Sequence, residues 1–331
     1  MRNPFIITLL ALAIMLLLSL GIGSVFIPPT EIWRALSGSA TSEIFRTILW
    51  DIRLPRTALI ALVGAALAGS GAAYQGLFRN PLADPYLIGV ASGAGLGAII
   101  AMSIKWPYTT LGLLAVPLAA FLTSLLTVYI VYSIAHIGGS VPTTNLILAG
   151  VAVSSFAVSL TSFLMLRSTG EVRRAIGWLL GGVSLAGWNA TLTLIPYLAI
   201  GLTTLVLSGY ALNLLQFGDD QATQMGLNVQ RAKFIIIIAA SLVTAAAVSF
   251  AGIIGFVGLI VPHIVRIWWG VDYRRLIPLS IIGGAAVLLF ADVLARIVLA
   301  PQELPVGIVT ALAGAPFFLW VLRRSKNQGF W

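Results

Sequence analysis

Residues 234–265, FIIIIAASLVTAAAVSFAGIIGFVGLIVPHIV, contain no aspartate, glutamate, lysine or arginine. A helix needs about 20 consecutive, mostly apolar residues to cross a membrane. This stretch is too long for one crossing, and with its flanking residues it predicts two spans, at 233–252 and 254–269. The stretch therefore indicates a membrane protein rather than a soluble domain.

The composition of the whole chain points the same way. Of its 331 residues, 59% are hydrophobic and only 9% are charged, whereas soluble domains carry about 25% charged residues. The net charge of +9 comes from basic residues scattered singly between apolar runs, a pattern that argues against a nucleic-acid surface. The chain has no cysteine, which excludes disulfides, thiolate metal sites and cysteine nucleophiles.

The apolar runs predict an all-α integral membrane protein of about ten spans in one domain, residues 1–331. The first run is interpreted as an uncleaved helix, because it lacks a signal-peptidase site. The third, eighth and tenth spans are short. The predicted spans are 5–26, 57–76, 87–104, 110–135, 145–166, 191–215, 233–252, 254–269, 277–299 and 306–322.

Ten spans place both termini on one side, and the basic tail Arg323–Lys326 predicts that this side is cytoplasmic. The charge bias is weak, because predicted outer segments also hold several arginines. Two segments are predicted to lie outside the spans. Residues 172–180 have the pattern of an interfacial helix on the outer surface. In the polar segment 216–231, Asp219 and Asp220 predict short cytoplasmic helices capped by aspartate, with breaks at Gly218 and Gly226.

Three further segments together carry a specific resemblance. They are RLPRTALIALVGAALAGSGAAYQGLFRNPLADPYLIGVASGAGLG at 53–97, GIIGFVGLIVPHIVRIWWGVDYRR at 252–275 and ADVLARIVLAPQELPVGIVTALAGAP at 291–316. In order and spacing they resemble the FecCD-type permeases, the membrane subunits of ABC importers for vitamin B12, haem and ferric siderophores. The resemblance covers nearly the whole chain.

The resemblance implies a type II ABC importer permease fold and no enzyme activity in this chain. It implies a homodimer of permeases, two cytoplasmic ATPase subunits that bind ATP and magnesium, and a substrate-binding protein that docks outside. It implies no cofactor and no metal in the permease itself. The chain has no Gly-x-x-x-x-Gly-Lys-Ser/Thr phosphate loop, which agrees with ATP binding in a partner.

Three sets of residues match the family's functional positions. The first set is implied to dock the binding protein through carboxylates, which arginine's planar fork suits; it consists of Arg53, Arg56 and Arg296. The second is implied to couple to the ATPase; it consists of Gly218, Asp219, Asp220, Ala222, Met225, Gly226 and Leu227. The third is implied to gate the cytoplasmic mouth; it consists of Asn80, Leu82, Thr143 and Thr144.

Each set also has a structural alternative. The arginines could anchor the chain at lipid headgroups, and Arg296 could pair with Asp292, four residues earlier on the same helix face. Thr143 or Thr144 could simply cap a helix. We also expect Asp84 to cap the third span and Glu303 to pair with a nearby arginine.

His263 follows Pro262 inside a span. A lone histidine there could relay protons or ligate haem, but carbonyls freed by the proline make a structural role the stronger interpretation. A secondary transporter would need a buried carboxylate for ion coupling, for which Asp292 alone is a candidate. An intramembrane hydrolase would need a Ser–His, paired-Asp or metal motif, and the sequence offers none.

Overall fold

The computed structural model describes residues 3–23, 25–38, 42–104, 106, 110–167, 172–183 and 186–325, so Lys326 of the basic tail lies outside the described residues. Within these ranges the chain is helical and contains no β-strand. The helices are α1 Pro4–Gly21, α2 Pro29–Leu36, α3 Glu43–Thr47, the π-helix η1 Ile48–Arg53, α4 Leu54–Leu77, α5 Val90–Met102, α6 Thr110–Ala135, α7 Thr143–Arg167, α8 Val172–Leu179, α9 Trp188–Leu207, α10 Gly209–Leu215, α11 Asp219–Gln224, α12 Val229–Ala251, α13 Val257–Trp269, α14 Tyr273–Ile297 and α15 Val306–Ser325.

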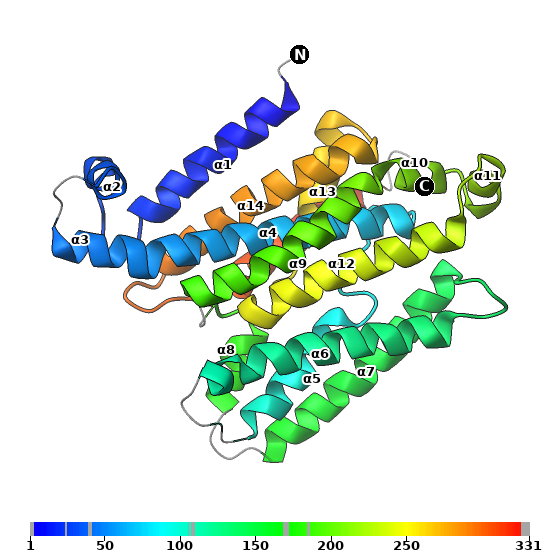
Figure 1. Ribbon diagram of the computed structural model, residues 1–331, viewed down its shortest axis with the longest axis horizontal. Coiled ribbons are helices and arrows are strands. Elements are labelled where there is room, and N and C mark those ends of the chain that lie inside the picture. Colours follow the sequence, from blue (N-terminus) through cyan, green and yellow to red (C-terminus); the bar gives the residue numbers. More distant parts are fainter. Residues whose placement is uncertain are drawn as a thin grey trace.

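Seven of the described helical stretches are long and apolar enough to cross a membrane. Three shorter apolar helices, α5, α13 and the apolar part of α15, occupy the positions of the third, eighth and tenth predicted spans. The prediction of an all-helical, multi-pass protein is therefore confirmed. Figure 1 shows the long helices running alongside one another, with α2 and α3 at one end of the bundle and α10 and α11 at the other.

Helix α4 lies at the centre of the bundle and packs against α14, α12, α13 and α9. Glycines bring its backbone into direct contact with its neighbours: a Cβ added to Gly64 would lie 2.3 Å from the Gly284 carbonyl oxygen. A Cβ added to Gly71 would lie 1.9 Å from the carbonyl oxygen of Gly258. Small residues allow such close helix crossings where lipid provides no hydrophobic drive between helices. The clustered glycines thus pack α4 against α14 and α13.

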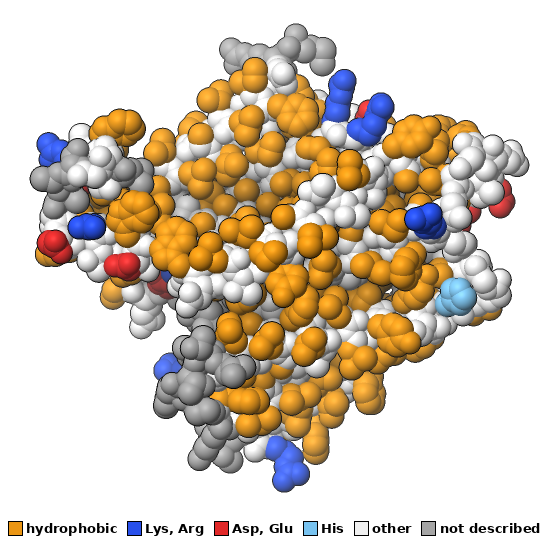
Figure 2. Space-filling view, viewed as in Figure 1, with side chains coloured by type: hydrophobic (Ala, Val, Ile, Leu, Met, Phe, Trp, Pro, Cys, Tyr) orange, Lys and Arg blue, Asp and Glu red, His pale blue; other side chains and the backbone are white. Residues whose placement is uncertain are grey.

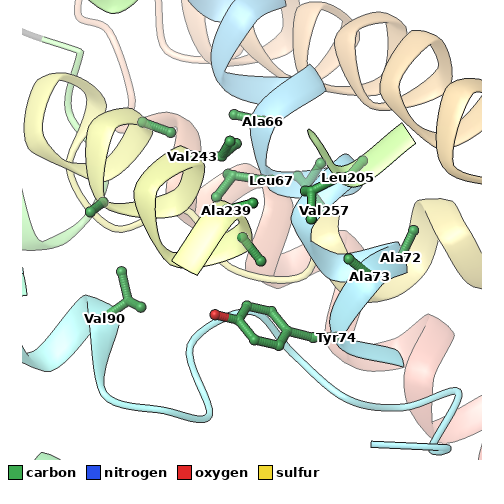
Figure 3. Close-up of a cluster of buried hydrophobic side chains, with 14 of the residues drawn as sticks. Ala66, Leu67, Ala72, Ala73, Tyr74, Val90, Leu205, Ala239, Val243 and Val257 are labelled. Carbon is green, nitrogen blue, oxygen red and sulfur yellow. The ribbon is translucent and has the colours of Figure 1, made fainter. Parts of the chain in front are cut away.

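The buried core follows α4 and α12. Figure 3 shows part of it, with Leu67 and Tyr74 of α4 beside Ala239 and Val243 of α12. The buried Tyr74 hydroxyl and the Ser241 hydroxyl lie 2.8 Å apart in a hydrogen bond. This bond satisfies two polar groups that would otherwise be costly to bury.

Apolar side chains also cover the outside of the bundle. Figure 2 shows hydrophobic groups across the middle of one face, with charged groups towards its margins. Leu207 of α9 is 77% exposed and Leu122 of α6 is 62% exposed. Exposed apolar surface of this extent is what a lipid-facing protein presents.

The structure corrects several predicted boundaries. The sixth predicted span, 191–215, is broken at Ser208 into α9 and α10. The eighth begins later than expected, because residues 252–256 are not helical and Gly252 has a φ of +74°. The helix predicted at 172–180 is present as α8, and one side of it, with Ala175 and Trp178, is buried against the bundle.

Candidate functional site

The three predicted docking arginines come together at the α3 end of the bundle. Arg56 of α4 donates from Nη2 to Asp292 Oδ1 of α14 at 2.9 Å and from Nη1 to Glu303 Oε2 at 2.6 Å. The Nε of Arg296 lies 3.0 Å from the other Asp292 oxygen. We call these residues, with Arg53, the arginine cluster. The expected pairing of Glu303 with an arginine is confirmed, and so is the alternative that Arg296 pairs with Asp292.

Two members of the arginine cluster bind the end of α1. Arg53 donates from Nη1 to the carbonyls of Leu20 and Gly21, at 2.5 and 2.9 Å, and from Nη2 to that of Val25. Arg296 donates from Nη1 to the carbonyls of Ser19 and Ile22, at 3.1 and 3.0 Å. The last carbonyls of a helix lack intrahelical partners and carry its partial negative charge. Two guanidinium groups therefore cap α1.

These contacts distinguish the three arginines. Arg53 is 5% exposed and Arg296 is 6% exposed, whereas 16% of the Arg56 side chain is exposed beside a Glu303 side chain that is 50% exposed. Among the three arginines, only Arg56 reaches the surface and pairs there with a solvent-exposed acid, Glu303. The capping role of Arg53 and Arg296 was missed, because no local sequence pattern indicates that α1 ends beside them.

The predicted coupling segment forms a single short helix, α11, at the opposite end of the bundle (Figure 1). The expected glycine breaks are present, with φ of +100° at Gly218 and +88° at Gly226. Gly218 is the N-cap of α11, so the expected aspartate cap is not formed and both aspartates lie in the first turn. One of them pairs with α12.

That ion pair joins Asp219 to Lys233, whose side chain is only 3% exposed. Ala222 is buried, whereas Asp220 and Met225 are exposed, the latter by 53%. Leu227 packs against the core. The segment thus has one side attached to the bundle and another that presents an acid and a methionine to solvent.

The predicted gate residues lie in two elements at the α11 end. The Asn80 side chain accepts a hydrogen bond from Leu82 N at 2.9 Å, which forms a compact turn directly after α4. Thr143 and Thr144 lie in the first turn of α7, within the helix. Further along, α7 packs against the segment that follows the Asn80 turn, because a Cβ added to Gly150 of α7 would lie 2.2 Å from the Leu87 carbonyl oxygen.

Asp84 caps a turn rather than the third span. Its carboxylate accepts from Tyr86 N at 2.8 Å, while α5 begins at Val90 with Gly89 as its N-cap. The Tyr86 hydroxyl in turn contacts both the carbonyl and the N–H of Ile254, at 2.9 and 3.2 Å. The two non-helical segments, 78–89 and 252–256, are joined through this tyrosine, which sequence reasoning overlooked.

Gln75, and not His263, bonds carbonyls near Pro262, one of which the proline leaves without an N–H donor. Proline has no N–H, so Pro262 cannot donate to the carbonyl of Gly258 four residues earlier. The Gln75 amide donates there at 3.5 Å and to the Leu259 carbonyl at 3.1 Å. His263 instead packs edge-on against Phe317. Among the described residues no group of three or more histidine, aspartate or glutamate side chains is placed to hold a metal ion.

Comparison with known proteins gives consistent matches over nearly the whole chain. The profile of the FecCD transport family matches residues 11–324. The cobalamin import system permease of Halobacterium salinarum is 46% identical over 85% of this chain and 74% of its own length. The hemin transport system permease of Yersinia pestis is 39% identical over 97% of this chain and 96% of its own. The solved inward-facing structure of a metal-chelate type ABC transporter is 28% identical, with a TM-score of 0.83 over 97% of this chain and 98% of that one.

Proposed function

This chain belongs to the FecCD transport family, and from that premise we propose that it is the permease subunit of a binding-protein-dependent ABC importer for a metal chelate. The observation that carries the proposal is the match, over almost all of the chain, to permeases named for cobalamin and hemin import. Both substrates are metal complexes of large tetrapyrrole-type ligands. We propose a chelate of this kind, with ferric siderophores as the other candidates.

In the proposed assembly the chain has ten spans, with both termini and α11 in the cytoplasm. Two copies form a homodimer above two ATPase subunits, which bind ATP and magnesium, and the permease itself carries no cofactor. One feature of α7 supports a pathway between the copies. Ser155, Ser159 and Ser162 are exposed on one side of this helix, each bonded to its own preceding turn. A row of hydroxyls suits a weakly polar pathway better than contact with lipid.

We propose that the arginine cluster receives the binding protein, with Arg56 as the contacting residue. A carboxylate of the binding protein would replace the half-exposed Glu303 beside Arg56 and form a charge-assisted, bidentate pair. Arg53 and Arg296 would act less directly, by keeping α1 and α14 in place around this contact. Replacing Arg56 by alanine should then weaken docking, and replacing Glu303 by glutamine should strengthen it.

At the other end, we propose that α11 fits a cleft of the ATPase and that Asn80, Leu82, Thr143 and Thr144 narrow the cytoplasmic mouth. The exposed Asp220 and Met225 supply the polar and apolar contacts of such a fit. ATP-driven closure of the ATPases would displace α11 and change the width of the mouth. A partner that distinguishes the two states is required, because only differential binding shifts an equilibrium between them.

The proposal is tested by reassembly of the complex. The permease would be purified with the ATPase and binding protein encoded beside it, and ATP hydrolysis measured with cyanocobalamin, hemin or ferrichrome added. We expect a stable complex whose hydrolysis is stimulated by the binding protein loaded with one of these chelates. A permease that retains neither partner, or hydrolysis that responds to none of the three, would contradict the proposal.

A further inference from the structure

Helix α10 connects the last long helix before the coupling segment to the coupling segment itself. It is separated from α9 by the break at Ser208 and buries Gly209, Leu212 and Leu215 against the bundle. Gly209 lies close to α14, because a Cβ added to it would lie 3.0 Å from the backbone of Arg274. The helix is therefore packed directly on the start of α14.

Asn213 of α10 forms hydrogen bonds to the start of α14 through both the nitrogen and the oxygen of its side-chain amide. Its Nδ2 donates to Asp272 Oδ1 at 2.6 Å, and its Oδ1 accepts from Tyr273 N at 2.9 Å. Asp272 is the N-cap of α14 and also accepts from Arg274 N. One asparagine thus fixes both the capping carboxylate and a free N–H of the first turn, two groups that a helix start must satisfy.

Gln216, directly after α10, bonds the end of α4. Its Nε2 donates to the Gly76 carbonyl at 2.9 Å, one of the last carbonyls of α4, and to the Leu212 carbonyl at 2.9 Å. Gly218 lies near the same place, since its Cβ would be 3.3 Å from the Arg79 guanidinium. Asn80 is the next residue, so α10 holds the coupling segment beside the proposed gate.

The two helices held by α10 form one unit along the bundle. α4 and α14 cross at Gly64 and Gly284 in backbone contact, and the Arg56–Asp292 ion pair joins them at the far end. Packed helices move as units, because tight interfaces resist continuous deformation. A displacement applied at α10 would therefore move both helices together.

We propose that α10 is a rigid clamp that transmits movement of residues 218–227 to the α4–α14 pair and to the turn at Asn80–Leu82, with Asn213 and Gln216 as positioning residues. This inference rests on the proposed coupling function. It assigns a mechanical role to two side chains whose hydrogen bonds join α10 to the ends of α14 and α4. The alternative is that α10 only completes the fold of α9 and plays no part in coupling.

The first test uses the permease alone. Because the chain has no cysteine, spin labels at Gln221→Cys in α11 and Arg275→Cys in α14, both exposed, report the distance across the clamp. N213D places two carboxylates together and should broaden the distance distribution. D272N keeps the acceptor and should not. N213D/D272N restores a donor–acceptor pair in the opposite sense and should restore a narrow distribution.

T204A is the matched control, since the exposed Thr204 hydroxyl bonds only its own helix, at the Ile200 carbonyl. A narrow distribution in N213D, or a broad one that the second substitution does not reverse, would overturn the clamp. This readout needs no substrate and no ATPase. It therefore decides the clamp separately from the proposed function.

The second test measures coupling in proteoliposomes that hold the permease, ATPase and binding protein. Uptake of cyanocobalamin or hemin is divided by ATP hydrolysed. N213D and Q216L should lower this ratio at least threefold while hydrolysis continues, and N213D/D272N should recover it. An unchanged ratio in N213D and Q216L would overturn the inference. Wild-type protein that takes up none of the probes would contradict the proposed function instead.

Discussion

Arg56 and Asp292 are 236 positions apart in the sequence, yet Asp292 Oδ1 accepts from both Nε and Nη2 of Arg56, at 3.1 and 2.9 Å. Asp292 is fully buried and also faces Arg296 at 3.0 Å. The cluster of three arginines and two acids has one positive charge in excess. The partial negative charge at the end of α1, which Arg53 and Arg296 cap, offsets that excess.

Asp292→Asn should destabilise the protein strongly. The change removes the buried acid shared by two arginines, and breaking a buried pair costs about 3–5 kcal/mol. Glu303→Gln removes a half-exposed partner of Arg56, for which a loss of about 0–1 kcal/mol is expected. Thermal unfolding in detergent should show a clear fall in Tm for D292N and little change for E303Q. Equal shifts would contradict the account of the cluster.

Arg296→Leu should release the end of α1. Hydrogen bonds to a charged donor contribute about 1.5–3 kcal/mol each, and this change removes those to the carbonyls of Ser19 and Ile22. In the otherwise cysteine-free chain, Ile22→Cys should then react faster with a water-soluble maleimide. The same substitution at Arg34, an exposed arginine paired with Glu31 in α2, is the control. An unchanged labelling rate in R296L would contradict the capping role.

Gly71→Ala should impair folding, because the new Cβ would lie 1.9 Å from the Gly258 carbonyl oxygen. Overpacking of a tight contact costs about 1–3 kcal/mol. The matched change Gly177→Ala lies in α8 with no heavy atom within 4 Å of the new Cβ, and alanine favours a helix by about 0.5–1 kcal/mol. Tm should fall for G71A and hold or rise for G177A; a reversed order would contradict the packing described.

Asp272 should make stability depend on acid pH. Hydrogen bonds from Arg274, chiefly, and from Asn213 hold the pKa of its carboxyl below the ordinary value of 3.8. When folding lowers the pKa of a carboxyl, the stability that this contributes is complete above the pKa of the unfolded state. It is lost progressively as the pH falls from there through the pKa of the folded state. Tm measured from pH 6 to pH 3 should therefore fall less in D272N than in the wild type. Parallel curves would show that Asp272 contributes nothing to this dependence.

Much of the fold could be predicted from hydropathy, because lipid requires long apolar helices. The span 110–135 matches α6 at both ends. Breaks inside apolar runs could not be predicted. The helix breaks at Ser208, within a run whose apolar composition shows no interruption. Residues 252–256 are kept non-helical by tertiary contacts such as the hydrogen bond between Tyr86 and Ile254.

The candidate site was predicted unevenly, for a similar reason. Residues in one helical turn, such as Asp292 and Arg296, could be paired from their spacing. The contacts of Arg53 with α1, of Gln75 with α13 and of Asn213 with Asp272 join elements distant in sequence. Only the packing of the helices brings those partners together, so no local sequence pattern predicts these contacts.

ATP-driven import is tested by uptake into proteoliposomes that contain this permease, its ATPase and its binding protein. Radiolabelled cyanocobalamin, haem and a ferric siderophore would be compared with ATP enclosed, without ATP, and without the binding protein. We expect one chelate to accumulate, and this accumulation to disappear when either ATP or the binding protein is omitted. Uptake that is independent of ATP and follows an imposed ion gradient would contradict the proposed import function and make Asp292 the candidate coupling residue.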